Sequence, residues 1–245
     1  DDAGGVTGDK YNDDNDATST GINEGFLPIG NNRYSSTKFT GEYDGAGYSI
    51  NNLTINRPTT RYMGLFGQTQ NASIKNLSLA NVNITGKEYM GSLVGMPYST
   101  IIDNSSVSGS VTGTFLVGGL VGYLYTGSSI RNSYSTASVV GSTHYIGGLV
   151  GYMYGSTVLN SYSIGNVTVP NNYVAYSGGL LGYKAGGTIT DSFYDKDTSG
   201  RTDTGKGTGK TTAQMKTLGT FTNWDFNDIW GIDTSGTING GYPYS

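Results

Sequence analysis

The chain has 245 residues, one His, no Cys and a net charge of -4, from 14 Lys and Arg against 18 Asp and Glu. This length allows one large domain or two small ones, and the absence of Cys excludes disulfides and thiolate chemistry. A single His without Cys also excludes a zinc centre, and no basic run is present that could hold nucleic acid. The longest apolar stretch, residues 115–125, is too short and too rich in Gly to cross a bilayer, so we expect no membrane insertion by this chain.

Residues 1–30 form an acidic, polar N-terminal lead whose centre is the Asp-rich stretch 9–16. This stretch crudely resembles a calcium-binding loop, yet it lacks the Gly and the distal Glu of the EF-hand spacing. We therefore expect a solvated loop over the end of the fold, without a metal or other cofactor.

Two short phrases recur through residues 31–194 at one common period. The first is Gly-Leu-x-Gly, or Ser-Leu-x-Gly in one copy, and its leucines stand at 65, 93, 120, 149 and 180, in steps of 28, 27, 29 and 31 residues. The second phrase ends in Asn at 76, 104, 132 and 160 and in Asp at 191. Two phrases in register at one period predict a repeat architecture.

Each period of about 28 residues contains three short β-like pieces and no helix signal, which predicts one turn of a three-sided solenoid. The predicted fold class is therefore all-β, a right-handed parallel β-helix of about six coils. Residues 38–55 supply the first of these coils, because stretch 50–55 matches stretch 74–79 and places Asn52 opposite Asn76.

Equivalent residues of stacked coils should form ladders. Strand alternation directs Ser133 and Ser135 inward and Tyr134 and Tyr162 outward. We expect an inner aliphatic ladder of Leu93, Leu120, Leu149 and Leu180. We also expect an amide ladder at a left-handed bend, made of Asn76, Asn104, Asn132 and Asn160.

Residues 195–245 form the C-terminal part. Stretch 195–210 is a loop rich in Gly, Thr, Lys and Asp, and stretch 211–218 is predicted to be a helix with a Thr N-cap. An aromatic cluster with Trp224 and Trp230 follows. Because an open solenoid end exposes core and strand edges, we expect the helix and this cluster to cap the C-terminal end, with both Trp residues in the core of the cap.

The repeats resemble the GLUG-motif family. Stretches 119–122 and 148–151 read Gly-Leu-Val-Gly, stretch 179–182 reads Gly-Leu-Leu-Gly, and Asn-Ser-Tyr-Ser stands at 132–135 and 160–163. The likeness extends over residues 26–245. It implies a parallel β-helix from bacterial secreted or cell-surface proteins, among them adhesin-like proteins and the non-catalytic parts of immunoglobulin A-cleaving metallopeptidases. The resemblance names no ligand.

The chain offers only weak signals for catalysis. Stretch 207–211 resembles a phosphate-binding loop, but position 204 is Thr where that loop requires Gly. His144 stands in a variable turn and no Gly-x-Ser-x-Gly elbow occurs, which argues against a catalytic triad. A polysaccharide-active β-helix enzyme stays an alternative, which would need carboxylates converging on one face. The charged residues at neighbouring ladder positions are Lys75, Asp103, Arg131 and Asp191.

Tyrosines give the strongest functional pattern. Tyr123, Tyr152 and Tyr183 follow successive Gly-x-x-Gly phrases, and Tyr134 and Tyr162 form a second series. Outward aromatic ladders on a rigid face suit sugar rings or a protein partner, because they give contact area at a low entropic cost. Stacking that only stabilises the solenoid is the alternative interpretation.

Ice binding is a further alternative, because flat and regular solenoid faces suit it and the chain is rich in Thr, Ser and Gly. Thr85 and Thr112 align at one ladder position, but Val140 and Val169 are expected as their successors, so Thr does not recur regularly.

We therefore predict a non-enzymatic adhesive or spacer module of a bacterial extracellular or cell-surface protein, present as a monomeric part of a larger protein. Its expected partner is a surface glycan or a protein of a host or neighbouring cell, and not nucleic acid. The predicted ligand-binding residues are Tyr123, Tyr134, Tyr152, Tyr162 and Tyr183. An ice-binding solenoid and a polysaccharide-active enzyme are the alternatives.

Overall fold

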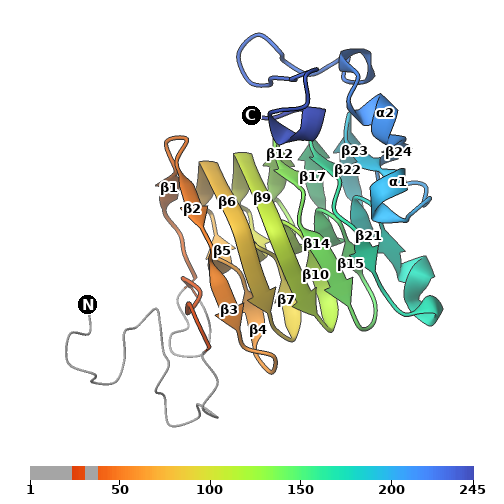
Figure 1. Ribbon diagram of the computed structural model, residues 1–245. Coiled ribbons are helices and arrows are strands. Elements are labelled where there is room, and N and C mark those ends of the chain that lie inside the picture. Colours follow the sequence, from red (N-terminus) through yellow and green to blue (C-terminus); the bar gives the residue numbers. More distant parts are fainter. Residues whose placement is uncertain (1–23, 31–37) are drawn as a thin grey trace.

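The computed structural model describes residues 24–30 and 38–245, which form a parallel β-solenoid of about five turns (Figure 1). The predicted all-β fold of stacked parallel coils is confirmed. Strands at residues 42–56 add an incomplete first coil ahead of the five turns. The Asp-rich stretch 9–16 lies outside the described residues.

Three sheets run the length of the solenoid. Sheet I contains β4 (Arg61–Met63), β7 (Glu88–Met90), β10 (Phe115–Gly118), β15 (Ile146–Gly147) and β20 (Ser177–Gly178). Sheet II contains β5 (Phe66–Gln70), β8 (Val94–Tyr98), β11 (Val121–Leu124), β16 (Val150–Met153) and β21 (Leu181–Lys184). Each of these strands pairs in parallel with its equivalent in the next coil.

Sheet III is wider and has 14 strands. They are β1 (Glu42–Asp44), β2 (Ser49–Asn51), β3 (Thr54–Asn56), β6 (Ser73–Thr85), β9 (Ile101–Gly113), β12 (Ser129–Arg131), β13 (Tyr134–Ser135), β14 (Ser138–Gly141), β17 (Ser156–Leu159), β18 (Tyr162–Ser163), β19 (Val167–Thr168), β22 (Gly187–Thr190), β23 (Phe193–Asp195) and β24 (Thr208–Lys210). The helices are short: the 3-10 helices η1 (Asn171–Tyr176), η2 (Leu218–Thr220) and η3 (Asn239–Gly241), and the α-helices α1 (Lys196–Ser199) and α2 (Thr212–Met215).

The interior of the solenoid is a set of stacked aliphatic side chains. The predicted ladder is confirmed, since all four leucines are fully buried: Leu93, Leu120, Leu149 and Leu180. Ser133 and Ser135 also point inward and are buried, as predicted. Removal of this apolar surface from water is the main stabilising term of such a fold.

The Gly-Leu-x-Gly phrase forms the corner between sheets I and II, and its glycines allow the coils to stack closely. A Cβ added to Gly151 would lie 2.6 Å from the carbonyl oxygen of Gly122, and one added to Gly182 would lie 2.4 Å from that of Gly151. No side chain fits at these distances, so the repeat of Gly is a steric requirement of the corner.

The predicted left-handed bend is also confirmed. Asn76, Asn104, Asn132 and Asn160 have φ values of 54°, 44°, 49° and 45°. The prediction of a continuous amide ladder is wrong, however. Asn104 Nδ2 donates to Asn76 Oδ1 at 2.9 Å, whereas Asn132 Nδ2 donates to Asp103 Oδ1 at 3.0 Å. A carboxylate accepts a hydrogen bond more strongly than an amide oxygen does, so Asp103 takes the place of the Asn104 amide.

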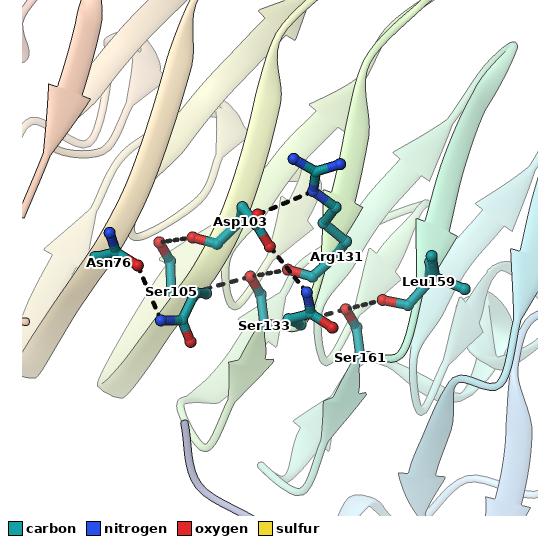
Figure 2. Close-up of polar contacts among 9 residues, drawn as sticks. Asn76, Asp103, Ser105, Arg131, Ser133, Leu159 and Ser161 are labelled. Carbon is teal, nitrogen blue, oxygen red and sulfur yellow. Dashed lines mark hydrogen bonds and ion pairs between the residues drawn. The ribbon is translucent and has the colours of Figure 1, made fainter. Parts of the chain in front are cut away.

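A buried serine ladder beside the bend satisfies the backbone there (Figure 2). Ser133 Oγ donates to its own coil, at the Arg131 carbonyl (2.7 Å), and accepts from the backbone N–H of Ser105 in the preceding coil (3.1 Å). Ser161 repeats both bonds one coil later, to Leu159 and from Ser133. Each hydroxyl thus pairs a backbone donor and acceptor that burial would otherwise leave without partners.

The register of the first coil differs from the prediction. Asn51 pairs with Ala80 and Thr54 with Asn83, so Asn52 lies level with Asn81 rather than with Asn76. Both Asn52 and Asn81 have positive φ, at 61° and 56°. The coil contains two left-handed bends that accept Asn, and the short phrase cannot distinguish one bend from the other.

The C-terminal part covers two different surfaces. Strand β24 pairs with β23 beyond the last full coil, and Lys206 Nζ donates to the carbonyls of Ser177 and Gly182 at 2.6 and 3.2 Å. Loop 200–210 therefore pairs with the backbone groups at the C-terminal end of the solenoid. We had expected the aromatic segment to cover this end. The helix predicted at 211–218 is α2 with a capping box at Thr211, but it ends at Met215; α1 was not predicted.

Candidate functional site

Aromatic side chains point outward from the solenoid on two surfaces. The first, which we call the capped ladder, consists of Tyr134, Tyr162 and Phe193 on the outer side of sheet III. The second, which we call the open aromatic face, lies over sheets I and II. It consists of Tyr62, Tyr89, Tyr98, Phe115, Tyr123, Tyr125, His144, Tyr145, Tyr152, Tyr154, Tyr173, Tyr176 and Tyr183.

The capped ladder lies beneath the C-terminal aromatic segment. The rings of Tyr134 and Tyr162 stack at 4.9 Å with an angle of 4°, and Trp230 packs 6.1 Å from each. Trp224 and Trp230 are themselves buried, as predicted, and Tyr162 has no exposed surface. The expectation that Tyr134 and Tyr162 form an exposed binding surface is therefore wrong, because residues 221–242 fold back over them.

Hydrogen bonds fix the buried hydroxyl of Tyr162. It donates to the Pro243 carbonyl at 2.5 Å and accepts from Asn239 Nδ2 at 2.7 Å. Burial raises the pKa of Tyr162 well above its ordinary value, and it also raises that of Tyr134. These phenols serve as neutral packing groups of the molecule.

The open aromatic face contains the predicted ladder on sheet II. Tyr123 is in register with Tyr152, and Tyr152 with Tyr183. The ring centroids of the first pair are 4.9 Å apart at 85°, and those of the second pair are 5.3 Å apart at 22°. The structure thus brings together three of the five predicted site residues on one accessible surface.

Two further ladders on this face were missed by the sequence reasoning. One lies on sheet I, where Tyr62 stacks on Tyr89 at 4.6 Å, and it continues at Tyr145 and Tyr176. The other follows sheet II and contains Tyr98, Tyr125 and Tyr154. The signal was present, because most of these tyrosines recur at steps of 27 to 31 residues, close to the period of the Gly-Leu phrase. The sheet I ladder skips one coil, where Leu116 stands between Tyr89 and Tyr145.

Left-handed backbone holds the sheet I ladder in place. Tyr62, Tyr89, Leu116 and Tyr145 have φ values of 61°, 59°, 56° and 65°. Bulky residues rarely adopt this conformation, which costs on the order of 1–3 kcal/mol at each position. The last Gly of the motif makes room for it, since a Cβ on Gly182 would lie 2.6 Å from the carbonyl carbon of Tyr145.

The face is electrostatically uneven. Near its N-terminal end Arg61 forms an ion pair with Glu88 at 2.8 Å. In the next coil Phe115 occupies the position of Glu88, and residues 132–183 contain no Asp, Glu, Lys or Arg. Burial and neighbouring tyrosines raise the pKa of Tyr123 to about 12, so its hydroxyl remains protonated and uncharged at physiological pH.

Each of the charged residues weighed for an enzyme site forms an ion pair or a hydrogen bond with a neighbouring side chain. Arg131 Nε lies 3.0 Å from Asp103 Oδ2, Lys75 Nζ lies 2.6 Å from Glu42, and Asp191 accepts from Asn223 at 3.0 Å. In residues 24–30 and 38–245 no three His, Asp or Glu side chains gather as metal ligands would. None of the described helices has the length and apolar composition of a membrane span.

Known proteins share both the repeats and the fold. The family model of the GLUG motif matches residues 113–140 and 142–168. These residues carry GLUG motifs, and we call the solenoid that contains them the GLUG-repeat domain. This domain is 37% identical over 110 residues to halomucin of Haloquadratum walsbyi, and 35% identical over 129 residues to an immunoglobulin A1 protease of Streptococcus sanguinis. A provisionally named Gly-rich membrane protein of Evansella cellulosilytica is 35% identical over 113 residues.

These matches cover 44%, 51% and 44% of the chain but only 1%, 6% and 13% of the three relatives, in the same order. The chain therefore spans only a small share of the length of each of these relatives. The fold of the GLUG-repeat domain also matches the crystal structure of a provisionally named immunoglobulin A1 protease from Bacteroides ovatus. The TM-score is 0.57 at 16% identity, over 83% of this chain and 77% of the other.

Proposed function

We propose that the GLUG-repeat domain is a non-enzymatic module of a bacterial surface or secreted protein that binds a glycan or protein partner through its open aromatic face. The names of the relatives support a surface or secreted setting. One observation carries the proposal: the chain covers one tyrosine ladder with its own C-terminal segment and leaves the face over sheets I and II accessible. An exposed aromatic surface of this extent on a rigid scaffold is typical of an interaction site.

The spacer function follows from the same architecture. Every coil pairs with its neighbours through parallel strands, so the solenoid is rigid along its axis. A rigid rod holds its side chains at fixed spacing and loses little conformational entropy on binding, which favours adhesion through many weak contacts.

The test is retention of the purified chain on an array of soluble glycans and insoluble polysaccharides, with and without calcium. We expect retention by the natural chain and its loss in a triple variant with Tyr123→Ala, Tyr152→Ala and Tyr183→Ala. Thr112→Ala, on the outer side of sheet III, is the matched control and should bind as the natural chain does. Equal retention of the triple variant would contradict the proposal.

One observation favours ice binding as a second candidate. We had expected Val169 to follow Val140 in the ladder of Thr85 and Thr112, but in the structure Val140 pairs with Thr168 of the next coil. Thr85, Thr112 and Thr168 therefore share one ladder on sheet III, which only Val140 interrupts. Thermal hysteresis of the natural chain tests this candidate, and no hysteresis at high protein concentration would remove it.

A further inference from the structure

The rings of the open aromatic face crowd together at its C-terminal end. Tyr145 lies 5.1 Å from Tyr183 and 6.2 Å from Tyr176, measured between ring centroids. The imidazole of His144 lies 4.6 Å from Tyr173 and 4.8 Å from Tyr176. We call this group the aromatic end cluster; it contains Phe115, His144, Tyr145, Tyr173, Tyr176 and Tyr183.

An insertion in the repeat builds this cluster. Helix η1 (Asn171–Tyr176) occupies part of the longest step between Gly-Leu phrases and supplies two of the rings. Tyr176 and Tyr183 are the last rungs of their ladders, so each has a ring of its own ladder on one side only. They are 41% and 39% exposed, whereas Tyr145 and Tyr152 are half-buried. Accessible ring surface therefore gathers at this end of the face.

The side-chain polar atoms of the cluster have no hydrogen-bond partners among the described residues. The side chains of His144, Tyr145 and Tyr176 make no hydrogen bond there. The hydroxyls of the buried tyrosines are bonded instead: Tyr162 to Pro243 and Tyr242 to Asp195, at 2.5 and 2.7 Å. The cluster thus combines accessible rings with hydrogen-bonding groups that only water or a ligand can satisfy.

The surroundings of the cluster are nearly free of formal charge. No charged residue stands between positions 132 and 183. At the edges of the cluster, Glu88 is in register with Phe115 and is paired with Arg61 and Lys87. Lys184 follows Tyr183 and is in register with the buried Met153, and Asp203 accepts from the backbone N–H of Gly179. The ammonium of Lys206 is turned toward the carbonyls of Ser177 and Gly182, and burial lowers its pKa. Recognition of a carboxylate or sulfate favours exposed and unpaired cations, above all Arg, whereas Arg61 and Lys87 at the edge of this surface are paired with Glu88.

We propose that the aromatic end cluster is a subsite for a neutral sugar unit of a glycan. The C–H face of a sugar ring would pack on Tyr176 and Tyr183, and its hydroxyls would bond the imidazole of His144 and the phenols. The inference rests on the proposed function, because it names the ligand class and the position for that same face. A purely apolar partner would leave the polar atoms unpaired, which costs free energy on binding.

The experiment uses the full chain with cellohexaose and mannohexaose as neutral probes and a polygalacturonate hexamer as the acidic probe. The double variant Tyr173→Ala, Tyr176→Ala removes two rings of η1. Val174→Ala is the matched control, since Val174 is exposed on the same helix and has no ring. His144 is the only histidine, so its imidazole NMR signals report on this cluster alone.

We expect a neutral probe to bind at both low and high salt and to shift the His144 signals, because neutral recognition is not screened. The double variant should bind roughly tenfold more weakly or worse, and Val174→Ala should bind as the natural chain does. Binding of the double variant at natural strength, together with loss in the Tyr123, Tyr152 and Tyr183 triple variant, would overturn the subsite but keep the proposed function. Binding of the acidic probe alone, weakened by salt, would overturn the neutral ligand class. No retention of any glycan or protein would overturn both proposals.

Discussion

The capped ladder and the open aromatic face are built from the same repeat, yet the molecule treats them differently. On the capped ladder, Tyr134 and Tyr162 stack at 4.9 Å under two Trp residues, and the Tyr162 hydroxyl is bonded to protein. On the open face, Tyr152 and Tyr183 stack at 5.3 Å without a protein cover and without hydroxyl partners among the described residues. Stacked tyrosines in a solenoid therefore do not by themselves indicate function; what covers them does.

The largest expected effect is a difference in stability between variants of the two surfaces. Trp230→Ala should lower the free energy of unfolding by about 3–5 kcal/mol, because a buried indole is removed and a cavity is left. Tyr152→Ala on the open face should cost only about 1–2 kcal/mol, since its half-exposed ring loses ring contacts and little buried area. Urea denaturation of both variants measures the difference, and equal losses would contradict it.

Alkaline pH gives the next largest effect. The pKa of Tyr162 in the folded state is raised above the unfolded value of about 10. The contribution of this phenol to the free energy of unfolding is therefore complete below about pH 10, and it is lost as the pH rises toward the folded pKa. Between pH 8 and pH 11 the natural chain should lose about 1–2 kcal/mol more stability than Tyr162→Phe does. Parallel pH profiles of the two proteins would show that burial does not hold this phenol protonated.

The smallest expected effect concerns single hydroxyl groups. Tyr162→Phe removes the hydrogen bonds to Pro243 and Asn239 and should cost about 1 kcal/mol. Tyr152→Phe removes an accessible hydroxyl and should change stability by less than about 0.5 kcal/mol. Thermal denaturation at neutral pH compares the two, and a larger loss in Tyr152→Phe would mean that the open-face hydroxyls stabilise the fold.

Much of the fold could be predicted because the repeat consists of short sequence motifs that lie within single coils. The Gly-Leu-x-Gly corner, the buried Leu120 and Leu149 and the left-handed Asn132 each follow from residues within one coil. The first coil was placed in the wrong register because Asn52 and Asn81 stand at a second bend of the same chemistry. A phrase of a few residues identifies a bend, but only strand pairing identifies which bend it is.

The candidate site was predicted in part. The ladder of Tyr123, Tyr152 and Tyr183 follows directly from the period, and the structure confirms its register. Tyr145 and Tyr176 recur at a similar step, yet they join the same face only because sheets I and II meet at the Gly corner. No local pattern joins those two strands on one surface.

By itself the sequence determined the solenoid, its period and the inward or outward direction of each strand residue, because these depend on backbone hydrogen bonding that repeats along the chain. Only the tertiary structure decided which outward tyrosines are covered. Tyr162 meets Pro243 across 81 residues of sequence, and that contact removes one ladder from solvent. The docking depends on a complementary aromatic surface formed by Trp224, Trp230 and Tyr242, and no periodic signal encodes a contact made once.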